Sequence, residues 1–331
     1  MKLALLSGAH VHTPGYLKTI RERDDLELAV VWDDMESRGQ AIAAEMGCPF
    51  EADLDAALRV AGLEATVICA DNAGHRKLVE ASAAAGLDIF CEKPMALSVD
   101  DANAMLAAIR GAGVLAVFGF FQPYQGAALA ARKLIAEGKL GTITQLTYRN
   151  SHHAAYGRWF DRPEVAWFTV PEKAGGGAFC DMGAHAMHFV RLVFGPVSSV
   201  SASISNKSNE YPAVDDHGVA LLEFESGATG VLEASWVFTG GPTGLEVVGS
   251  KGSLRVRGNQ CEFTPFDAKP GEVQVIEPLE AEPTRLERLV ALKQGLLDRA
   301  EADRDLDSCR DAVAISVAAY ASSREGRRVN P

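Results

Sequence analysis

The first 120 residues alternate short apolar runs with longer segments of helical spacing, and this alternation restricts the fold more than any other feature. Strands buried on both faces read as continuous Val, Ile and Leu runs, and helices between them make the crossovers of a parallel sheet. The expected strands are Leu3–Leu6, Leu26–Trp32, Ala65–Ala70, Asp88–Cys91 and Val114–Phe120, and the expected helices include Glu36–Met46, His75–Ala85 and Val99–Ile109. The pattern predicts an α/β fold that begins with a doubly wound, Rossmann-type parallel sheet over residues 1–121.

The rhythm changes after residue 121, where a helix at Gln125–Glu137 leads into longer segments of alternating apolar and polar residues. Two hairpins turn at Ser226-Gly227 and at Ser250–Gly252, and consecutive hairpins predict a largely antiparallel sheet with one covered face. Two late helices are expected at Arg285–Arg299 and Ser308–Arg324. We therefore expect a second domain of the α+β class over residues 122–331.

Charge and cysteine usage exclude several classes of protein. The chain has 44 acidic and 32 basic residues, a net charge of −12, which is the wrong sign for nucleic acid or an anionic membrane surface. The six cysteines are scattered without a C-x-x-C pair, which favours reduced thiols and a cytoplasmic location over a disulfide framework. No run approaches the roughly 20 apolar residues of a membrane helix. A soluble protein with a small-molecule partner is expected.

The loop from Ser7 to Pro14 follows the first strand and opens a helix, which is where a dinucleotide pyrophosphate binds. Thr13 is expected to cap that helix, with Pro14 in its first position. The glycine pattern G-x-G-x-x-G is degenerate, because its three positions read Ser7, Ala9 and His12 in one register and Gly8, His10 and Thr13 in the other. The expected cofactor contacts of this loop are Ser7, Gly8, Ala9, His10 and Val11.

The second strand ends in Trp32-Asp33-Asp34, where a carboxylate can meet the adenosine ribose. Such a group accepts hydrogen bonds from both ribose hydroxyls and repels a 2′-phosphate, so Asp33 favours NAD. Arg38 lies close by in the sequence and keeps NADP as the alternative cofactor.

Polar residues also follow the third and fourth strands, with Asn72 and His75 after one and Glu92-Lys93-Pro94 after the other. Open α/β sheets bind ligands at the carboxyl ends of their strands. A lysine there can donate to a substrate hydroxyl, and Pro94 stiffens the loop and is a candidate for a cis peptide bond.

A triple glycine, Gly175–Gly177, precedes an apolar helix with three polar exceptions, Asp181, His185 and His188. These positions are four and three residues apart, so the side chains share one helix face. Because burial of an unpartnered carboxylate is costly, a stripe of an acid and two imidazoles is more typical of a cleft wall than of a core.

Three motifs in this order and spacing resemble the glucose–fructose oxidoreductase and inositol dehydrogenase family (Gfo/Idh/MocA): Glu92-Lys93-Pro94, Gly175–Gly177 with Asp181-x-Gly183-x-His185, and the closing Tyr320–Val329. The resemblance covers nearly the whole chain. It implies a Rossmann domain followed by a domain with an open, mostly antiparallel sheet, often used to form homodimers or homotetramers.

The resemblance also implies roles for individual residues. Lys93 and His185 are the expected catalytic lysine and acid/base histidine, and Asp181 orients the substrate. Asn72, His75, Glu92 and Lys93 are expected to line the dinucleotide. The implied enzyme is an NAD(P)-dependent sugar or polyol dehydrogenase.

In that reaction His185 would take the proton of a secondary hydroxyl, and the Lys93 ammonium would stabilise the developing alkoxide. Aromatic faces and imidazoles suit a sugar, polyol or glycoside, although such residues also build interfaces. The expected substrate contacts are His152, His153, Tyr156, Trp159, Trp167 and His188.

Three other functions fit parts of the pattern. The first is an NAD-retaining glycosidase that acts by transient oxidation and elimination. The second is a non-catalytic, dinucleotide-responsive binding protein, which the degenerate glycine loop suggests. The third is metal-assisted hydrolysis by Asp181, His185 and His188 with His152 or His153, but this helical spacing is uncommon for zinc and no metal is expected.

Overall fold

The computed structural model describes residues 1–331 and divides the chain into two compact units. Unit 1 contains residues 1–119, 160–175 and 284–310, and unit 2 contains residues 120–159, 176–283 and 311–331. The first change of unit follows Gly119, close to the boundary expected after residue 121. The two later returns to unit 1 are not part of the expected division.

Unit 1 is built on a five-stranded parallel sheet with the order β2-β1-β3-β4-β5. The strands are β1 (Lys2–Leu6), β2 (Glu27–Trp32), β3 (Ala65–Ile68), β4 (Asp88–Cys91) and β5 (Ala116–Phe118). All residues of β3 and β4 are buried, as their continuous apolar runs predicted. The Rossmann-type sheet is confirmed, and its order reverses between β1 and β3, where such sheets bind ligands.

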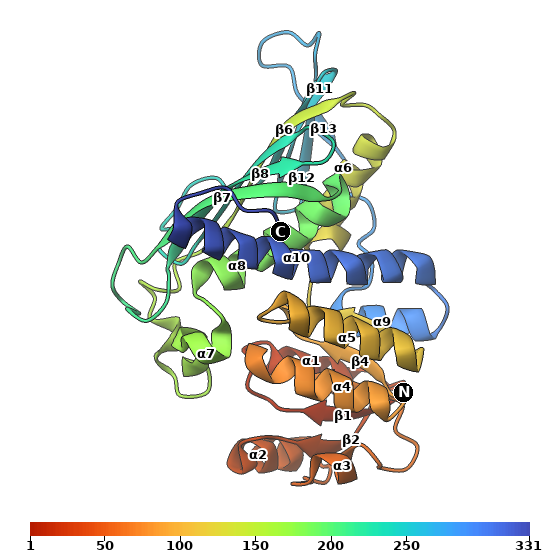
Figure 1. Ribbon diagram of the computed structural model, residues 1–331. Coiled ribbons are helices and arrows are strands. Elements are labelled where there is room, and N and C mark those ends of the chain that lie inside the picture. The colour runs from red at the N-terminus through yellow and green to blue at the C-terminus, as the bar shows by residue number, and fades with distance from the viewer. The chain divides into compact units, whose positions relative to one another are not determined.

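The helices of unit 1 come from both ends of the chain (Figure 1). They are α1 (Thr13–Glu22), α2 (Glu36–Met46), α3 (Leu54–Ala57), α4 (His75–Ala84), α5 (Val99–Ala112), α7 (Pro171–Ala174) and α9 (Arg285–Lys293), with short 3₁₀ turns at Asn72–Gly74 and Ala166–Thr169. One buried cluster joins Leu17 of α1 and Leu289 of α9 to Val67 and Phe90 of the strands. The late helix α9 therefore covers the same sheet as α1, next to the carboxyl edge that holds the loops of interest.

Unit 2 contains an eight-stranded sheet with the order β13-β12-β11-β10-β6-β9-β8-β7. The strands are β6 (Ile143–Ser151), β7 (Val197–Ser205), β8 (His217–Phe224), β9 (Thr229–Ser235), β10 (Gly244–Gly249), β11 (Gly252–Arg257), β12 (Gln260–Pro265) and β13 (Gln274–Ile276). Only β6 and β9 pair in parallel. Both predicted hairpins, β8–β9 and β10–β11, are confirmed.

Helix α8 (Ala178–Phe194) packs across β6, β8 and β9 and carries the polar stripe of the sequence. Met187 and Val190 of α8 share a buried core with α6 (Gly126–Ala136) and with residues 312–319 of α10 (Arg299–Glu325). Residues 299–310 of α10 belong to unit 1, and the rest of the helix belongs to unit 2.

The start of α8 is fixed by a group of hydrogen bonds. The Asp215 carboxylate accepts from the N–H groups of Gly177 and Phe179, both at 2.8 Å, and from the Tyr320 hydroxyl at 2.7 Å. A Cβ on Gly177 would lie 1.8 Å from the Asp215 carbonyl oxygen, and one on Gly176 would lie 2.2 Å from the Tyr320 hydroxyl. These two glycines are therefore required by close packing, and part of the closing motif supports α8.

None of the helices combines the length and the hydropathy that crossing a bilayer requires. None of the six cysteines forms a disulfide.

Candidate cofactor and catalytic sites

The loop between β1 and α1 offers open backbone donors. The Gly8 N–H donates to Asp33 Oδ2 at 2.8 Å, and a Cβ on Gly8 would lie 2.3 Å from Ile42 Cδ1, so only glycine fits. The N–H groups of Ala9 and Val11 donate to no protein acceptor. Helix α1 begins at Thr13, so His12 and not Thr13 is at the N-cap, which corrects the expected cap by one residue. Open N–H groups ahead of a ten-residue helix suit an anion such as a pyrophosphate.

His10 stands at the second glycine position in one register of the pattern, but its side chain is turned into the protein and the residue is 2% exposed. The ring lies 5.6 Å from Phe168 and 6.0 Å from Trp167 between centroids, and the Trp167 indole N–H donates to the Ala9 carbonyl at 2.9 Å. Burial lowers the pKa of His10 to about 3, so the imidazole is neutral near pH 7. The outer side of the β1–α1 loop is therefore lined by backbone atoms and not by the His10 side chain. The loop can still present its N–H groups to an anion although its glycine pattern is degenerate.

Asp33 and Arg38 form one hydrogen-bonded group at the end of β2. Asp33 Oδ2 accepts from Arg38 Nε at 2.9 Å, and Oδ1 accepts from Arg38 Nη2 and from the Met35 N–H. Arg38 also donates to Ser7 Oγ at 3.1 Å and to Asp34 at 2.7 Å. A ribose hydroxyl can reach Asp33 only by sharing one of these oxygens, so the predicted ribose contact stays a prediction.

The carboxylate of Glu92 lies at the centre of a buried network. Its Oε1 accepts from the Tyr16 hydroxyl and from His12 Nδ1 at 2.9 Å, and lies 3.6 Å from His10 Nδ1. Burial acts to raise the pKa of Glu92, but the nearby imidazoles of His10 and His12 and the Lys93 ammonium hold it well below its usual range. Glu92 is therefore an anion whose Oε1 has little room for another hydrogen-bond donor. The sequence did not predict that Tyr16, His12 and His10 surround this carboxylate.

The loop after β4 is fixed from several directions. The Lys93-Pro94 peptide is cis, as the sequence suggested, and the Lys93 N–H donates to Glu92 Oε2 at 3.0 Å. Fully buried His75 contacts the Pro94 carbonyl oxygen through Nδ1 at 2.9 Å. Asn72 donates to the Ala174 carbonyl at 2.9 Å. These contacts position Lys93, while the direct cofactor contacts of Asn72 and His75 stay predictions.

In unit 2, α8 presents Asp181 and His185 one turn apart. Asp181 Oδ2 accepts from the Trp236 indole N–H at 3.1 Å, and Trp236 is fully buried. The His185 ring meets Phe120 edge-on, with centroids 5.7 Å apart at 90°, and lies 5.2 Å from Phe121 at 71°. Both candidate catalytic side chains are thus held in fixed orientations by aromatic residues that sequence reasoning did not single out.

His188 differs from the other two members of the stripe. It is fully buried and stacks on Phe120 with centroids 4.2 Å apart and planes inclined by 6°. The His188 ring therefore packs against Phe120, which in turn contacts His185. The expected contact of His188 with the substrate stays a prediction.

Five of the six expected substrate contacts lie in unit 2, and four of these share one loop after β6. His152 stacks on Trp159 at 4.8 Å, and His153 meets the same indole edge-on at 5.2 Å. Tyr156 is 52% and Trp159 43% exposed, which leaves aromatic faces open to a ligand. Trp167 instead belongs to unit 1, where its indole N–H donates to the Ala9 carbonyl of the loop between β1 and α1, called the phosphate loop below.

Unit 1 has a cavity of about 280 Å³ beside the phosphate loop, lined in part by Gly8, Ala9, Val11, Arg38 and Arg162. Polar groups and open N–H donors around this space fit the phosphate and ribose parts of a dinucleotide. On this observation the residues present are suited to NAD, whose site would be held by the loop, Arg38 and Asp33.

Two family models match the chain. The model described as the oxidoreductase family with an NAD-binding Rossmann fold matches residues 6–120, and the model of the GFO/IDH/MocA C-terminal domain matches residues 128–255. Together they cover both the phosphate loop and helix α8.

Curated and solved relatives agree with these matches. The chain is 25% identical over 252 residues, 75% of its length, to a 2,7-anhydro-N-acetylneuraminate hydratase from Mediterraneibacter gnavus, and spans 65% of that relative. It is 28% identical over 347 residues to a D-apiose dehydrogenase from Paraburkholderia graminis, covering 98% of this chain and 88% of the relative. The structure of GenD2 from gentamicin A biosynthesis in complex with NAD covers 100% of this chain and 96% of its own at 25% identity, with a TM-score of 0.78.

Proposed function

Because the chain belongs to the Gfo/Idh/MocA family of NAD-binding oxidoreductases, we propose that it transfers a hydride between a nicotinamide dinucleotide and a secondary hydroxyl of a sugar, polyol or glycoside. The observation that carries the proposal is the open backbone cradle of Ala9 and Val11, in a segment that matches the family's NAD-binding model. The named dehydrogenase among the relatives acts on a sugar, which supports the substrate class.

The proposed cofactor is NAD. The Asp33 carboxylate at the end of β2 disfavours a 2′-phosphate by like charge. Arg38 offers the opposite charge at the same place, so NADP is the alternative that parallel assays with both cofactors decide.

The bound nicotinamide supplies a hydride acceptor, and the side chains of the chain manage the proton. We assign His185 to take the hydroxyl proton at an imidazole nitrogen, since the rings of Phe120 and Phe121 fix its plane. The Lys93 ammonium stabilises negative charge on the same oxygen. Asp181, held by Trp236, orients the substrate through a neighbouring hydroxyl. The loop with His152, His153, Tyr156 and Trp159 contacts the sugar ring.

His185→Ala tests this assignment. We expect turnover to fall by roughly 10²–10⁴, while the dissociation constant for NAD changes little because His185 makes no proposed contact with the phosphate loop. The measurement is NADH absorbance over a panel of polyols and sugars, with NAD binding followed by calorimetry. His217→Ala is the matched control, since His217 lies on β8 outside the proposed machinery. Turnover of His185→Ala near the wild-type value contradicts the assignment.

A redox-neutral reaction is the second candidate, favoured by one specific observation. The relative named 2,7-anhydro-N-acetylneuraminate hydratase carries a name that implies no net oxidation. An NAD-retaining glycosidase that oxidises a sugar transiently, eliminates the aglycone, adds water to the unsaturated keto sugar and returns the hydride to the ketone would use the same Lys93 and His185. A protein that binds NAD but acts on no sugar in either way would instead be a non-catalytic dinucleotide-responsive binding protein.

A further inference from the structure

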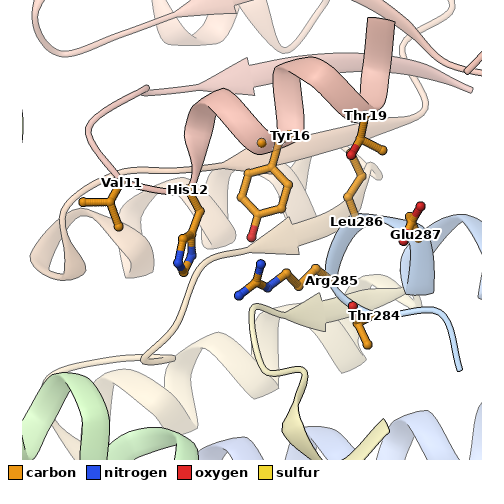
Figure 2. Close-up of a pocket in the computed structure, with 9 residues that line it drawn as sticks. Val11, His12, Tyr16, Thr19, Thr284, Arg285, Leu286 and Glu287 are labelled. Carbon is orange, nitrogen blue, oxygen red and sulfur yellow. The ribbon is translucent and has the colours of Figure 1, made fainter. Parts of the chain in front are cut away.

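A second cavity of unit 1 lies between the beginnings of α1 and α9 and has a volume of about 390 Å³ (Figure 2). This size is within the range of roughly 300–1,000 Å³ that small-molecule sites occupy. We call it the anion pocket; its lining residues are Val11, His12, Gly15, Tyr16, Thr19, Thr284, Arg285, Leu286 and Glu287. None of them is among the cofactor or substrate contacts expected above except Val11.

Arg285 and Glu287 give the lining of the anion pocket one positive and one negative charge. In Figure 2 the nitrogen end of the Arg285 side chain points toward the Tyr16 hydroxyl and His12, while Glu287 lies at the opposite end of the pocket. The hydroxyl-bearing side chains of Thr19 and Thr284 also line the space. A guanidinium with nearby hydroxyl groups binds a planar carboxylate through charge-assisted hydrogen bonds.

The backbone conformation of Arg285 supports a role for its side chain in ligand binding. Its φ is 56°, a left-handed conformation that is uncommon for a residue other than glycine. Such conformations cost free energy and cluster where a side chain must be aimed at a functional site. The conformation places Arg285 as the first residue of the nine-residue helix α9.

The anion pocket adjoins the Glu92 network. His12 and Tyr16 line the pocket and both hydrogen-bond to Glu92 Oε1, and Glu92 directly precedes Lys93. The His12 side chain is 32% exposed while that of Glu92 is 0% exposed, so His12 separates the buried anion from the open space. Two side chains of the pocket lining therefore contact the Glu92 carboxylate directly.

We propose that the anion pocket binds the carboxylate of the substrate, so that the substrates are sugar acids such as aldonates or uronates and not neutral polyols. This inference rests on the proposed dehydrogenase function. It assigns Arg285 as a specificity-determining residue, with Thr19 and Thr284 as additional donors.

Calorimetry with NADH-saturated protein tests the pocket without turnover, because the reduced cofactor cannot accept a hydride from an alcohol; D-gluconate and its neutral counterpart D-glucitol are the probes. We expect the wild type to bind D-gluconate more tightly than D-glucitol. Arg285→Asn removes the charge with a residue that tolerates positive φ, and should weaken D-gluconate binding roughly tenfold to hundredfold. Arg285→Lys, which keeps the charge, should retain part of the affinity. Lys18→Gln, an exposed charge change on α1, is the control and should bind as the wild type does.

Three results overturn the inference: equal binding of D-gluconate by the wild type and Arg285→Asn, competition between D-gluconate and NAD, or Arg285-dependent binding of inorganic phosphate without binding of D-gluconate. Competition would mean that the pocket holds part of the dinucleotide.

Steady-state assays separate the carboxylate pocket from the proposed dehydrogenase function. Oxidation of D-glucitol by the wild type with a kcat/KM as high as that of D-gluconate, and with both values unchanged in Arg285→Asn, leaves the dehydrogenase and removes the carboxylate pocket. Arg285-dependent D-gluconate binding without oxidation of any sugar leaves the pocket and removes the dehydrogenase.

Discussion

His10 replaces a glycine of the dinucleotide loop, and its ring explains how the loop tolerates the replacement. A side chain on the outer face would occupy the space of a pyrophosphate, whereas the imidazole lies inside, against Trp167 and Phe168. The sequence pattern predicted a poorer dinucleotide-binding loop at this position, because a glycine pattern records the residue type and not the direction of the side chain. Gly8, which the pattern kept in one register, is the position where a Cβ would collide with Ile42.

The buried imidazole of His10 makes stability depend on pH. Burial lowers its pKa from 6.5 to about 3, so at pH values between these two the unfolded chain binds a proton that the folded protein does not. The free energy of unfolding therefore falls as the pH falls from 6.5, by up to about 1.4 kcal/mol per pH unit. Above pH 6.5 both states are neutral at this residue and the contribution is constant.

His10→Gln should therefore show a shallower loss of stability than the wild type between pH 6.5 and 5. Urea unfolding at pH 7.5, 6.5, 5.5 and 5.0 measures the slope for both proteins. Gln40→Ala, which removes an exposed neutral side chain on α2, is the control and should keep the wild-type slope. An unchanged slope in His10→Gln would show that His10 is not the group that titrates.

At the scale of the element, residue spacing in α8 predicted which side chains share a helix face. It did not predict which distant residues hydrogen-bond to the start of the helix. The four-residue spacing correctly placed Asp181 and His185 on one side of a buried helix. It could not reveal Asp215 and Tyr320, since these residues reach the start of α8 from distant parts of the chain. Long-range hydrogen bonds leave no periodic signal in a single sequence.

Asp215→Ala should destabilise unit 2 by about 1–3 kcal/mol, because the N–H groups of Gly177 and Phe179 and the Tyr320 hydroxyl lose their shared acceptor. Tyr320→Phe, which removes a single hydroxyl, should cost less. Chemical denaturation measures both changes. The control is Asp267→Ala, because Asp267 is exposed in the loop after β12. If Asp215→Ala is as stable as this control, the hydrogen bonds to the Asp215 carboxylate contribute nothing to the stability of the fold.

The late helices show where element prediction failed. The segment Arg285–Arg299 was expected to be one helix, but α9 ends at Lys293 and α10 begins at Arg299. Gly295 has a φ of 72° between them, a conformation that ends a helix. The expected helix at Ser308–Arg324 was therefore too short at its beginning, since α10 already starts at Arg299.

At the scale of the whole molecule, the sequence predicted the two architectures but not the path of the chain between them. Local periodicity identified the parallel sheet and the hairpins because each depends on neighbouring residues. The returns of residues 160–175 and 284–310 to unit 1 depend on packing between distant segments. The second return carries Arg285, which explains why this residue of the pocket beside the Glu92 network was not predicted.

The reaction class is a property of the whole protein and separates the two proposed functions. A net dehydrogenase releases one NADH for each sugar oxidised, because the hydride leaves with the cofactor. A redox-neutral enzyme returns the hydride to the product and cleaves a glycoside with no change in NADH. Since the relative named D-apiose dehydrogenase, which the chain matches over most of its length, is a dehydrogenase of a sugar, we expect net NADH in equal amount to the oxidised product.

The decisive measurement follows NADH absorbance and p-nitrophenol release from p-nitrophenyl glycosides in the same reaction, with the bound cofactor of the purified protein quantified beforehand. The expected result is NADH formation without p-nitrophenol release. His185→Ala and Lys93→Met should be inactive in whichever reaction occurs, which ties the signal to the proposed residues. Release of p-nitrophenol that requires bound NAD, yet yields no NADH, would replace the dehydrogenase by the NAD-retaining glycosidase, because the same acid/base pair would then serve both the oxidation and the return of the hydride.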